Sequence, residues 1–339
     1  MKKSLSFFLP IVVIVFSLTL LNCGSNSTPP PSATPSDQFA FIREAGGSGF
    51  AHVAEAKGVP RLRQHRLTPR GLGLQPWAND IDPGTDSVVL MNNDGTGETV
   101  VADQAGWFYS IQMAVDGKSG VFTSDVTSDG MTYEHIFVAQ AMSQSTFTVT
   151  QLTTDAEHHY VPQLSPDGTK VVLTKYNPDI DQEQAYVMSV SGGAETLIPT
   201  PDTMLVLNPT FTPDGTGIIF EDCNIDSINQ VKLDGTGMVV LNNADGTYLD
   251  DLPSASADGK YITFIQDGNV MRMDINGQNV TQLTNDDASW DAMFVNKKIV
   301  FLSSRDDVTG YEIYSMNVDG TNQTRLTNNN FYEWFNDFD

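Results

Sequence analysis

The sequence predicts an all-β fold, a six-bladed β-propeller of four-stranded antiparallel blades. The first observation is a repeat: a short strand-like run ends in Asp-Gly four times, in phrases that begin at residues 111, 162, 209 and 253. Their spacings of 51, 47 and 44 residues are typical of one supersecondary unit repeated in a ring or a stack. The second observation is that three more short apolar runs follow each phrase. Four strands in a unit of this length indicate a propeller blade.

Each element of the repeat has the sequence of a short strand or of a tight turn. In the unit that begins at Pro162, strands are expected at residues 170–175, 185–190 and 195–198, after the first turn. The matching strands of the later units are expected at residues 217–220, 228–233, 238–241, 261–265, 269–274, 280–284, 298–302, 311–316 and 323–327. Asp-Gly and Asn-Gly pairs separate many of these runs, and both residue types tolerate the positive φ of hairpin turns. No amphipathic helix of three turns interrupts the pattern.

The two ends of the repeat region should complete one blade between them. Residues 331–338 are an aromatic run that resembles a single innermost strand, and residues 38–43 resemble a second strand that lacks its first. Residues 87–92 and 98–101 match the last two strands of a blade. Pairing the C-terminal strand with residues 38–43 closes the ring and removes an exposed sheet edge. Five complete blades, which start near residues 107, 158, 204, 248 and 289, and this split blade make six.

Residues 44–86 leave an alternative for the number of blades. We interpret them as a long insertion in the split blade. Residues 50–54 and 63–68 can instead be strands of a further, reduced blade, which would make seven.

Three phrases of the repeat resemble the TolB-type β-propellers. They are Leu-Ser-Pro-Asp-Gly-Thr-Lys at residues 164–170, Tyr-Ser-Met-Asn-Val-Asp-Gly at 314–320 and Thr-Arg-Leu-Thr at 324–327. The resemblance covers most of residues 107–330 and is specific for the fold. It is less specific for function, because this repeat serves envelope scaffolds, sensor domains and regulatory domains of some peptidases. We expect no separate N-terminal α/β domain of the kind that TolB itself carries.

The N-terminus has the layout of an export signal. Lys2 and Lys3 precede an apolar run at residues 7–21, which is shorter than the ~20 residues of a spanning helix. The run leads into Leu-Leu-Asn-Cys, which resembles a bacterial lipobox. The resemblance implies a lipoprotein signal peptide over residues 1–22 and lipidation of Cys23, with a plain signal peptide as the alternative. Since Asp does not follow Cys23, the sorting rule for such lipoproteins implies the outer membrane, facing the periplasm or the cell surface.

The mature chain should consist of a tether and one domain. Residues 23–37 are rich in Pro and Ser and contain no core-forming side chain, so they predict a flexible tether before the propeller at 38–339. The formal net charge of −24 argues against nucleic acid or anionic lipid as a partner. Contact with the membrane is therefore expected only through the lipid anchor. Cys223 has no partner if Cys23 is acylated, and is expected to be a small buried residue.

Sequence motifs of catalysis and of metal binding are absent. The sequence contains no Gly-x-Ser-x-Gly and no His-Glu-x-x-His. His158 and His159 are adjacent, so on a strand they point to opposite faces and cannot easily share a metal. Residues 179–183 carry alternate carboxylates but lack the glycine of a calcium loop. We therefore predict no catalytic residue, no metal and no cofactor.

The loops that join the outermost strand of one blade to the innermost strand of the next should gather on one face, around the axis. We call them junction loops. They mix aromatic rings with carboxylates, a composition that suits recognition of a partner. The predicted partner-binding residues are Trp107, Tyr109, His158, His159, Tyr160, Asp250, Asp251, Trp290, Asp291, Glu333 and Trp334. The alternative is that about half of these aromatic side chains pack between blades.

The junction loops contain no Lys or Arg, so we expect their carboxylates to repel one another and to favour an open, wet surface or a bound cation. Binding should depend on Tyr160, Trp290 and Trp334, and alanine at the two tryptophans should leave the fold intact.

The predicted function is that of a non-enzymatic binding or scaffold protein of the cell envelope. It should be a monomer whose TolB-like face binds an envelope protein or a cell-wall or polysaccharide component. The first alternative is a carbohydrate-active or hydrolytic enzyme at the axial mouth, with Asp250, Asp251, Asp291 and Glu333 as candidates for a pair about 5 Å apart. The second is binding of a polysaccharide or a small ligand without turnover.

Overall fold

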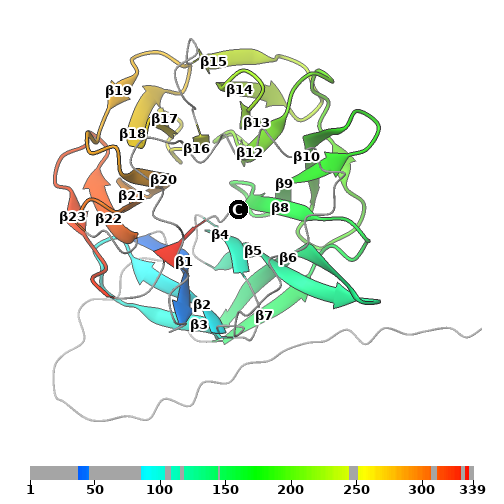
Figure 1. Cartoon of the computed structure of the whole chain (residues 1–339), viewed down its shortest axis with the longest axis horizontal. Coiled ribbons are helices and arrows are strands. Elements are labelled where there is room, and N and C mark those ends of the chain that lie inside the picture. The colour runs from blue at the N-terminus through cyan, green and yellow to red at the C-terminus, as the bar shows by residue number, and fades with distance from the viewer. Residues whose placement is uncertain are drawn as a thin grey trace, which may run out of the picture.

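The computed structural model describes residues 37–45, 85–103, 108–114, 118–143, 146–243, 251–306, 311–329 and 333–335. Within these residues, six four-stranded antiparallel sheets stand as blades around a central axis, and no α-helix occurs (Figure 1). The predicted six-bladed propeller is confirmed. No helix in this part of the chain could cross a membrane. Cys23, the predicted signal peptide and all of the predicted tether except Asp37 lie outside the described residues.

Five blades each use four consecutive strands, whose innermost members β4, β8, β12, β16 and β20 lie nearest the axis (Figure 1). Blade 2 contains β4 (Phe108–Met113), β5 (Ser119–Ser128), β6 (Met131–Ser143) and β7 (Thr146–Gln151), and blade 3 contains β8 (His159–Leu164), β9 (Lys170–Asn177), β10 (Gln182–Ser189) and β11 (Thr196–Leu197). Blade 4 contains β12 (Val206–Phe211), β13 (Gly217–Asp222), β14 (Ser227–Lys232) and β15 (Val239–Asn243). Blade 5 contains β16 (Asp251–Ala255), β17 (Tyr261–Gln266), β18 (Asn269–Asp274) and β19 (Thr281–Gln282), and blade 6 contains β20 (Ser289–Val295), β21 (Lys298–Ser303), β22 (Glu312–Asn317) and β23 (Thr324–Arg325).

Blade 1 is assembled from both ends of the domain. Strand β1 (Gln38–Ala45) pairs along its length with β2 (Thr85–Asn92), and β3 (Thr99–Asp103) lies outermost. The innermost strand is β24 (Glu333–Trp334), which pairs with β1 in antiparallel register. Closure of the ring by the C-terminal strand is therefore confirmed. The predicted insertion lies mostly outside the described residues, as do the two segments of the alternative reduced blade.

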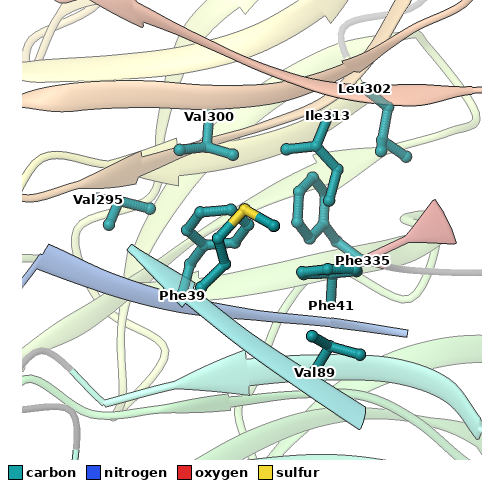
Figure 2. Packing of buried hydrophobic residues seen from close by; sticks show 9 residues of the cluster. Phe39, Phe41, Val89, Val295, Val300, Leu302, Ile313 and Phe335 are labelled. Carbon is teal, nitrogen blue, oxygen red and sulfur yellow. The ribbon is translucent and has the colours of Figure 1, made fainter. Parts of the chain in front are cut away.

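Apolar packing holds this closure together, along with one ion pair between Arg43 and Glu333. Phe335 is fully buried, and its ring meets the ring of Phe39 edge-on at 5.9 Å between centroids. Figure 2 shows Phe335 between Phe41 of blade 1 and Ile313 of blade 6, within one continuous cluster. Full burial of a Phe side chain contributes about 1.5–3 kcal/mol.

A repeated irregularity shapes the start of the innermost strands. The second or third residue of four of them has a positive φ, between 47° and 51°, and the register with the second strand shifts there by one residue. These residues are Val161, Asn208, Leu252 and Asp291. Such a bulge bends the strand and increases its twist. It therefore sets the direction of the junction residues immediately before it.

The Asp-Gly pairs are confirmed as turns. In blade 3, Gly168 has a φ of 68°, and Asp167 Oδ1 accepts hydrogen bonds from Ser165 Oγ and from the backbone N–H of Thr169. These bonds lower the pKa of Asp167 to about 2. Blade 4 repeats the arrangement with Asp214. Cys223 is buried, as predicted.

Candidate functional site

The junction loops and the loops between second and third strands lie on the same face of the ring, because neighbouring strands of each blade are antiparallel. We call this the junction face. The structure describes the side chains of Tyr109, His158, His159, Tyr160, Trp290, Asp291 and Glu333 among the predicted partner-binding residues. Of Asp251 and Trp334 only the backbone is described, and Trp107 and Asp250 lie outside the described residues.

The junction between blades 2 and 3 brings aromatic rings together. His158 lies parallel to Tyr160, with 6.0 Å between ring centroids and 3° between planes, and 5.4 Å from Tyr133. His158 Nδ1 is 3.0 Å from Glu134 Oε2. Nearby in blade 2, Tyr109 donates a hydrogen bond of 3.0 Å to Asp125 Oδ2. We call Tyr133, His158 and Tyr160 the ring cluster.

The hairpin that carries Tyr133 extends this surface. Strands β5 and β6 have 10 and 13 residues, whereas the paired second and third strands of the other blades have 6 to 8. The tip of the hairpin places Met131 at 59% exposure on the junction face. A solvent-exposed methionine beside aromatic rings is a composition found at binding surfaces.

His159 lies on the opposite side of the same strand and is fully buried. Its Nε2 is 2.8 Å from Glu195 Oε1 and 3.4 Å from Asp155 Oδ1. Lys175 Nζ donates to both carboxylates, at 2.9 Å to Asp155 Oδ2 and 3.1 Å to Glu195 Oε2. Burial acts to raise the pKa of Glu195, but contact with His159 and Lys175 lowers it overall. The inference that His158 and His159 face different surroundings is correct.

His135 of β6 completes this buried group from the neighbouring blade. It is buried, its Nδ1 lies 3.0 Å from Thr153 Oγ1, and its ring centroid is 5.7 Å from that of His159. Burial, and secondarily the nearby His159, lowers the pKa of His135 to about 4. His135 is therefore uncharged near neutral pH. The sequence analysis missed it because no local motif links a third strand to the junction that follows its blade.

A pocket of about 410 Å³ opens beside these residues. Its walls include Thr153, Asp155, Lys175, Tyr186 and Glu195. Solvent and small ions therefore reach the carboxylates, although His159 itself is closed off.

The junction loops contain no Lys or Arg, but cations from other elements offset the expected repulsion between their carboxylates. Lys175 lies beside Asp155, Arg43 Nη2 is 2.7 Å from Glu333 Oε1, and Arg305 Nη2 is 2.6 Å from Asp286 Oδ2. These cations come from the ends of second strands, which reach the junction face next to the loops. A count restricted to the loops could not include them.

Two of the candidate catalytic carboxylates lie at positions with a structural role. Glu333 is 2% exposed and accepts hydrogen bonds from Arg43 and Asn329 at the closure of the ring. Burial raises the pKa of Glu333 in spite of these bonds. Asp291 lies at the bulge of β20, where Asp tolerates the positive φ better than most residues.

Trp290 packs between blades, as the alternative for the junction aromatics expects. It is half-buried and contacts the clusters that contain Phe335 and Phe301. Its removal would therefore disturb packing, contrary to the expectation that alanine at this position leaves the fold intact.

Comparisons with known proteins agree with this architecture. The family model of the TolB beta propeller domain matches residues 86–335. TolB from Acinetobacter baumannii is similar at 17% identity and a TM-score of 0.61, over 86% of this chain and 63% of that one. This chain thus spans less than two thirds of that protein's length.

Two further solved structures are similar. A protein described as TolB from Agrobacterium tumefaciens has 18% identity and a TM-score of 0.57, over 73% of this chain and 88% of that one. A chain of the nidogen/laminin complex has 11% identity and a TM-score of 0.57, over 84% and 91%. At these identities the structural likeness shows the fold alone. No curated protein sequence matches this chain.

Proposed function

This chain belongs to the TolB β-propeller family, and on that premise we propose that it is a non-enzymatic binding protein of the cell envelope that holds a partner protein on its junction face. The family supports a protein-binding propeller scaffold in general. The observation that carries the finer proposal is the ring cluster beside the exposed tip of the β5–β6 hairpin. Tyrosine side chains offer a large contact area at a small entropic cost, and a flexible methionine adapts to the shape of a partner.

Electrostatics indicate the kind of partner. Glu134 and Asp125 flank the ring cluster, and Glu157 is exposed in the same junction loop. The chain as a whole has a formal net charge of −24. A basic segment of a partner protein, with Arg side chains that stack on the rings and pair with the carboxylates, complements this surface best.

The closed ring favours this role, because it presents the surface in a fixed shape. Each blade packs on its neighbours, and β24 joins the last blade to the first. A preorganised surface loses little conformational entropy on binding.

The proposal also includes the location of the protein in the cell. We place it outside the cytoplasm, anchored through Cys23 after removal of residues 1–22, at the outer membrane and facing the periplasm or the cell surface. The family membership and the apolar run before Cys23 support export. In Cys23→Ser, the protein should move from the membrane pellet to the soluble periplasmic or culture fraction. Retention of this variant in the pellet after a salt wash would contradict the anchor.

Binding is tested by capture of partners from envelope extract. We compare the native chain with the double variant His158→Ala/Tyr160→Ala. The matched control is Val239→Ala/Val240→Ala, which removes two exposed side chains from blade 4. The proposal expects proteins retained by the native chain and by the control to be lost from the ring-cluster variant. If all three retain the same proteins, the ring cluster is not the binding surface.

We assign no turnover to the chain. A carbohydrate-active or hydrolytic enzyme, or a polysaccharide binder, remains the competing class. It would be favoured by hydrolysis of a polysaccharide or peptide panel that is lost in Asp291→Asn or Glu333→Gln.

A further inference from the structure

We propose that His135, Asp155 and His159 bind one divalent transition-metal ion, of the zinc, nickel or copper type, between blades 2 and 3. One potential ligand atom from each residue lies within 4.8 Å of the other two. Two imidazole nitrogens and one carboxylate oxygen are a donor set that these ions favour over magnesium or calcium.

The distances require a small closure around the ion. Ligand atoms on a tetrahedral ion with bonds of about 2.0–2.2 Å lie roughly 3.3–3.6 Å apart. Asp155 is the member that can move, because it is on a loop and about half exposed, whereas both histidines are buried. Its Oδ1 is already 3.4 Å from His159 Nε2.

The buried nitrogens of His159 give an independent reason to expect a ligand. The ring is fully buried, and neither nitrogen has a hydrogen-bond partner. Glu195 Oε1 approaches Nε2 to 2.8 Å without the alignment of a hydrogen bond. Buried polar atoms in native proteins are rarely left without a partner. A metal ion at Nε2 would supply one.

The neighbouring groups orient the other two ligands. In the tautomer that donates Nδ1–H to Thr153 Oγ1, His135 presents the lone pair of Nε2, as is usual for histidines that bind a metal. The Oδ2 atom of Asp155 is held by Lys175, so that Oδ1 is left toward His159. Thr153 and Lys175 thus act as positioning residues.

Charge and access permit a cation in spite of Lys175. Asp155 and Glu195 together carry two negative charges when ionised, and Lys175 carries one positive charge, so one negative charge is left for a cation to balance. The adjacent pocket is lined by Asp155 and Glu195 and gives an ion a route from solvent to Asp155, the ligand that can move toward the histidines. Three protein ligands leave a fourth position open to water or to a side chain of a partner.

The experiment is a calorimetric titration of the purified, chelator-treated chain with zinc ion alone. The native chain should bind one zinc per molecule. His159→Gln and His135→Gln should each weaken binding by at least about tenfold, because even outer-shell changes at such sites cost 10–100-fold. His158→Gln is the matched control, since it alters the adjacent, exposed histidine, and it should bind like the native chain.

Asp155→Asn keeps the test decisive if a buried histidine variant fails to fold. Asp155 is exposed, so this variant should retain the native melting temperature and lose at least about tenfold in zinc affinity. Cobalt in place of zinc should give the visible spectrum of a tetrahedral site only where His135 and His159 are both present. Failure of the folded native chain to bind one zinc, or equal binding by Asp155→Asn, would show that the three residues do not form a metal site.

Discussion

Two junctions of the ring have the same backbone plan and different chemistry. In the junction between blades 2 and 3, His159 begins the innermost strand, and in the junction between blades 5 and 6, Ser289 occupies that position. Thr153 and Thr284 precede them equivalently, because each accepts a hydrogen bond from the third strand of the preceding blade. Equivalent positions can therefore be compared directly.

In the junction between blades 5 and 6, one arginine joins the junction loop to the strands of blade 6. The Arg305 guanidinium pairs with Asp286 at 2.6 Å, donates to Ser289 Oγ at 3.1 Å and contacts Gln323 Oε1. It also lies over the rings of Phe301 and Tyr314. Gln323 in turn donates to the backbone oxygen of Leu283, directly after the outermost strand of blade 5, so the polar groups of this junction link blade 6 to blade 5.

In the junction between blades 2 and 3, the cation is a lysine, which by register aligns with Ser303 and not with Arg305. Lys175 reaches Asp155 and Glu195 but is not hydrogen-bonded to the nitrogens of His159, and a pocket opens beside it. Under the proposed function, the first of these junctions serves binding and the second holds its blades together. A planar guanidinium joins several partners at once, whereas an ammonium is a compact point charge.

Removal of the closing strand should have the largest effect of any change considered. Deletion of residues 331–339 takes away Phe335 and leaves Arg43 without Glu333. The truncated chain should lose more stability than Phe335→Ala, which should cost about 3–5 kcal/mol. Urea and thermal denaturation of the native chain, the truncated chain and Phe335→Ala measure this loss. An unchanged melting temperature in the truncated chain would rule out closure by the C-terminus.

Loss of Arg305 should lower the free energy of unfolding more than loss of Lys175. Arg305→Ala should lower the free energy of unfolding by about 1–3 kcal/mol, because it removes several hydrogen bonds and two ring contacts. Lys175→Ala should cost only about 1 kcal/mol, because Asp155 is half exposed and regains water. Denaturation of both variants under one buffer condition decides the order. An equal or larger cost for Lys175→Ala would make the junction between blades 2 and 3 structural as well.

The Asp-Gly turns on the face opposite the junction face provide a reference for the comparison, because blades 3 and 4 each contain such a turn. Hydrogen bonds hold the pKa of Asp167 at about 2 and lower that of Asp214 in the same way, against an ordinary value of 3.8. A lowered native pKa means that the unfolded chain takes up the proton first. The stability from these turns is therefore present above pH 3.8 and is lost as the pH falls toward 2.

Asp167→Asn and Asp214→Asn should each give a small loss of stability at pH 7. The difference from the native chain should shrink as the pH falls below 3.8, and stability measured from pH 7 to pH 2 checks this. A difference that stays constant over this range would mean that the carboxylate charge has no part in the turn.

Local sequence was sufficient to predict the blades and the closure. Asp167 and Gly168 show their turn directly, and the aromatic run that contains Phe335 had no other place in the repeat. The bulge at Asp291 was not visible, because Val161 and Leu252 adopt the same φ and share no sequence signal with it. The environment of His159 was also not predictable.

That environment depends on residues that are distant in sequence. His135 belongs to the preceding blade, and Lys175 reaches the junction from the end of a second strand. Side chains meet there because blades pack side by side, a relation that a single repeat does not contain. A search of the second and third strands near each junction would have found both residues.

The central claim is that the junction between blades 2 and 3 binds the partner, whereas the junction between blades 5 and 6 maintains the ring. Tyr160 and Trp290 test it most directly, because they occupy the same position of their innermost strands. For Tyr160→Ala and Trp290→Ala we would measure the amount of each envelope protein captured per folded molecule, together with the melting temperature. The account predicts that Tyr160→Ala loses capture at a nearly native melting temperature, and that Trp290→Ala melts earlier with capture retained. The reverse pattern would contradict it.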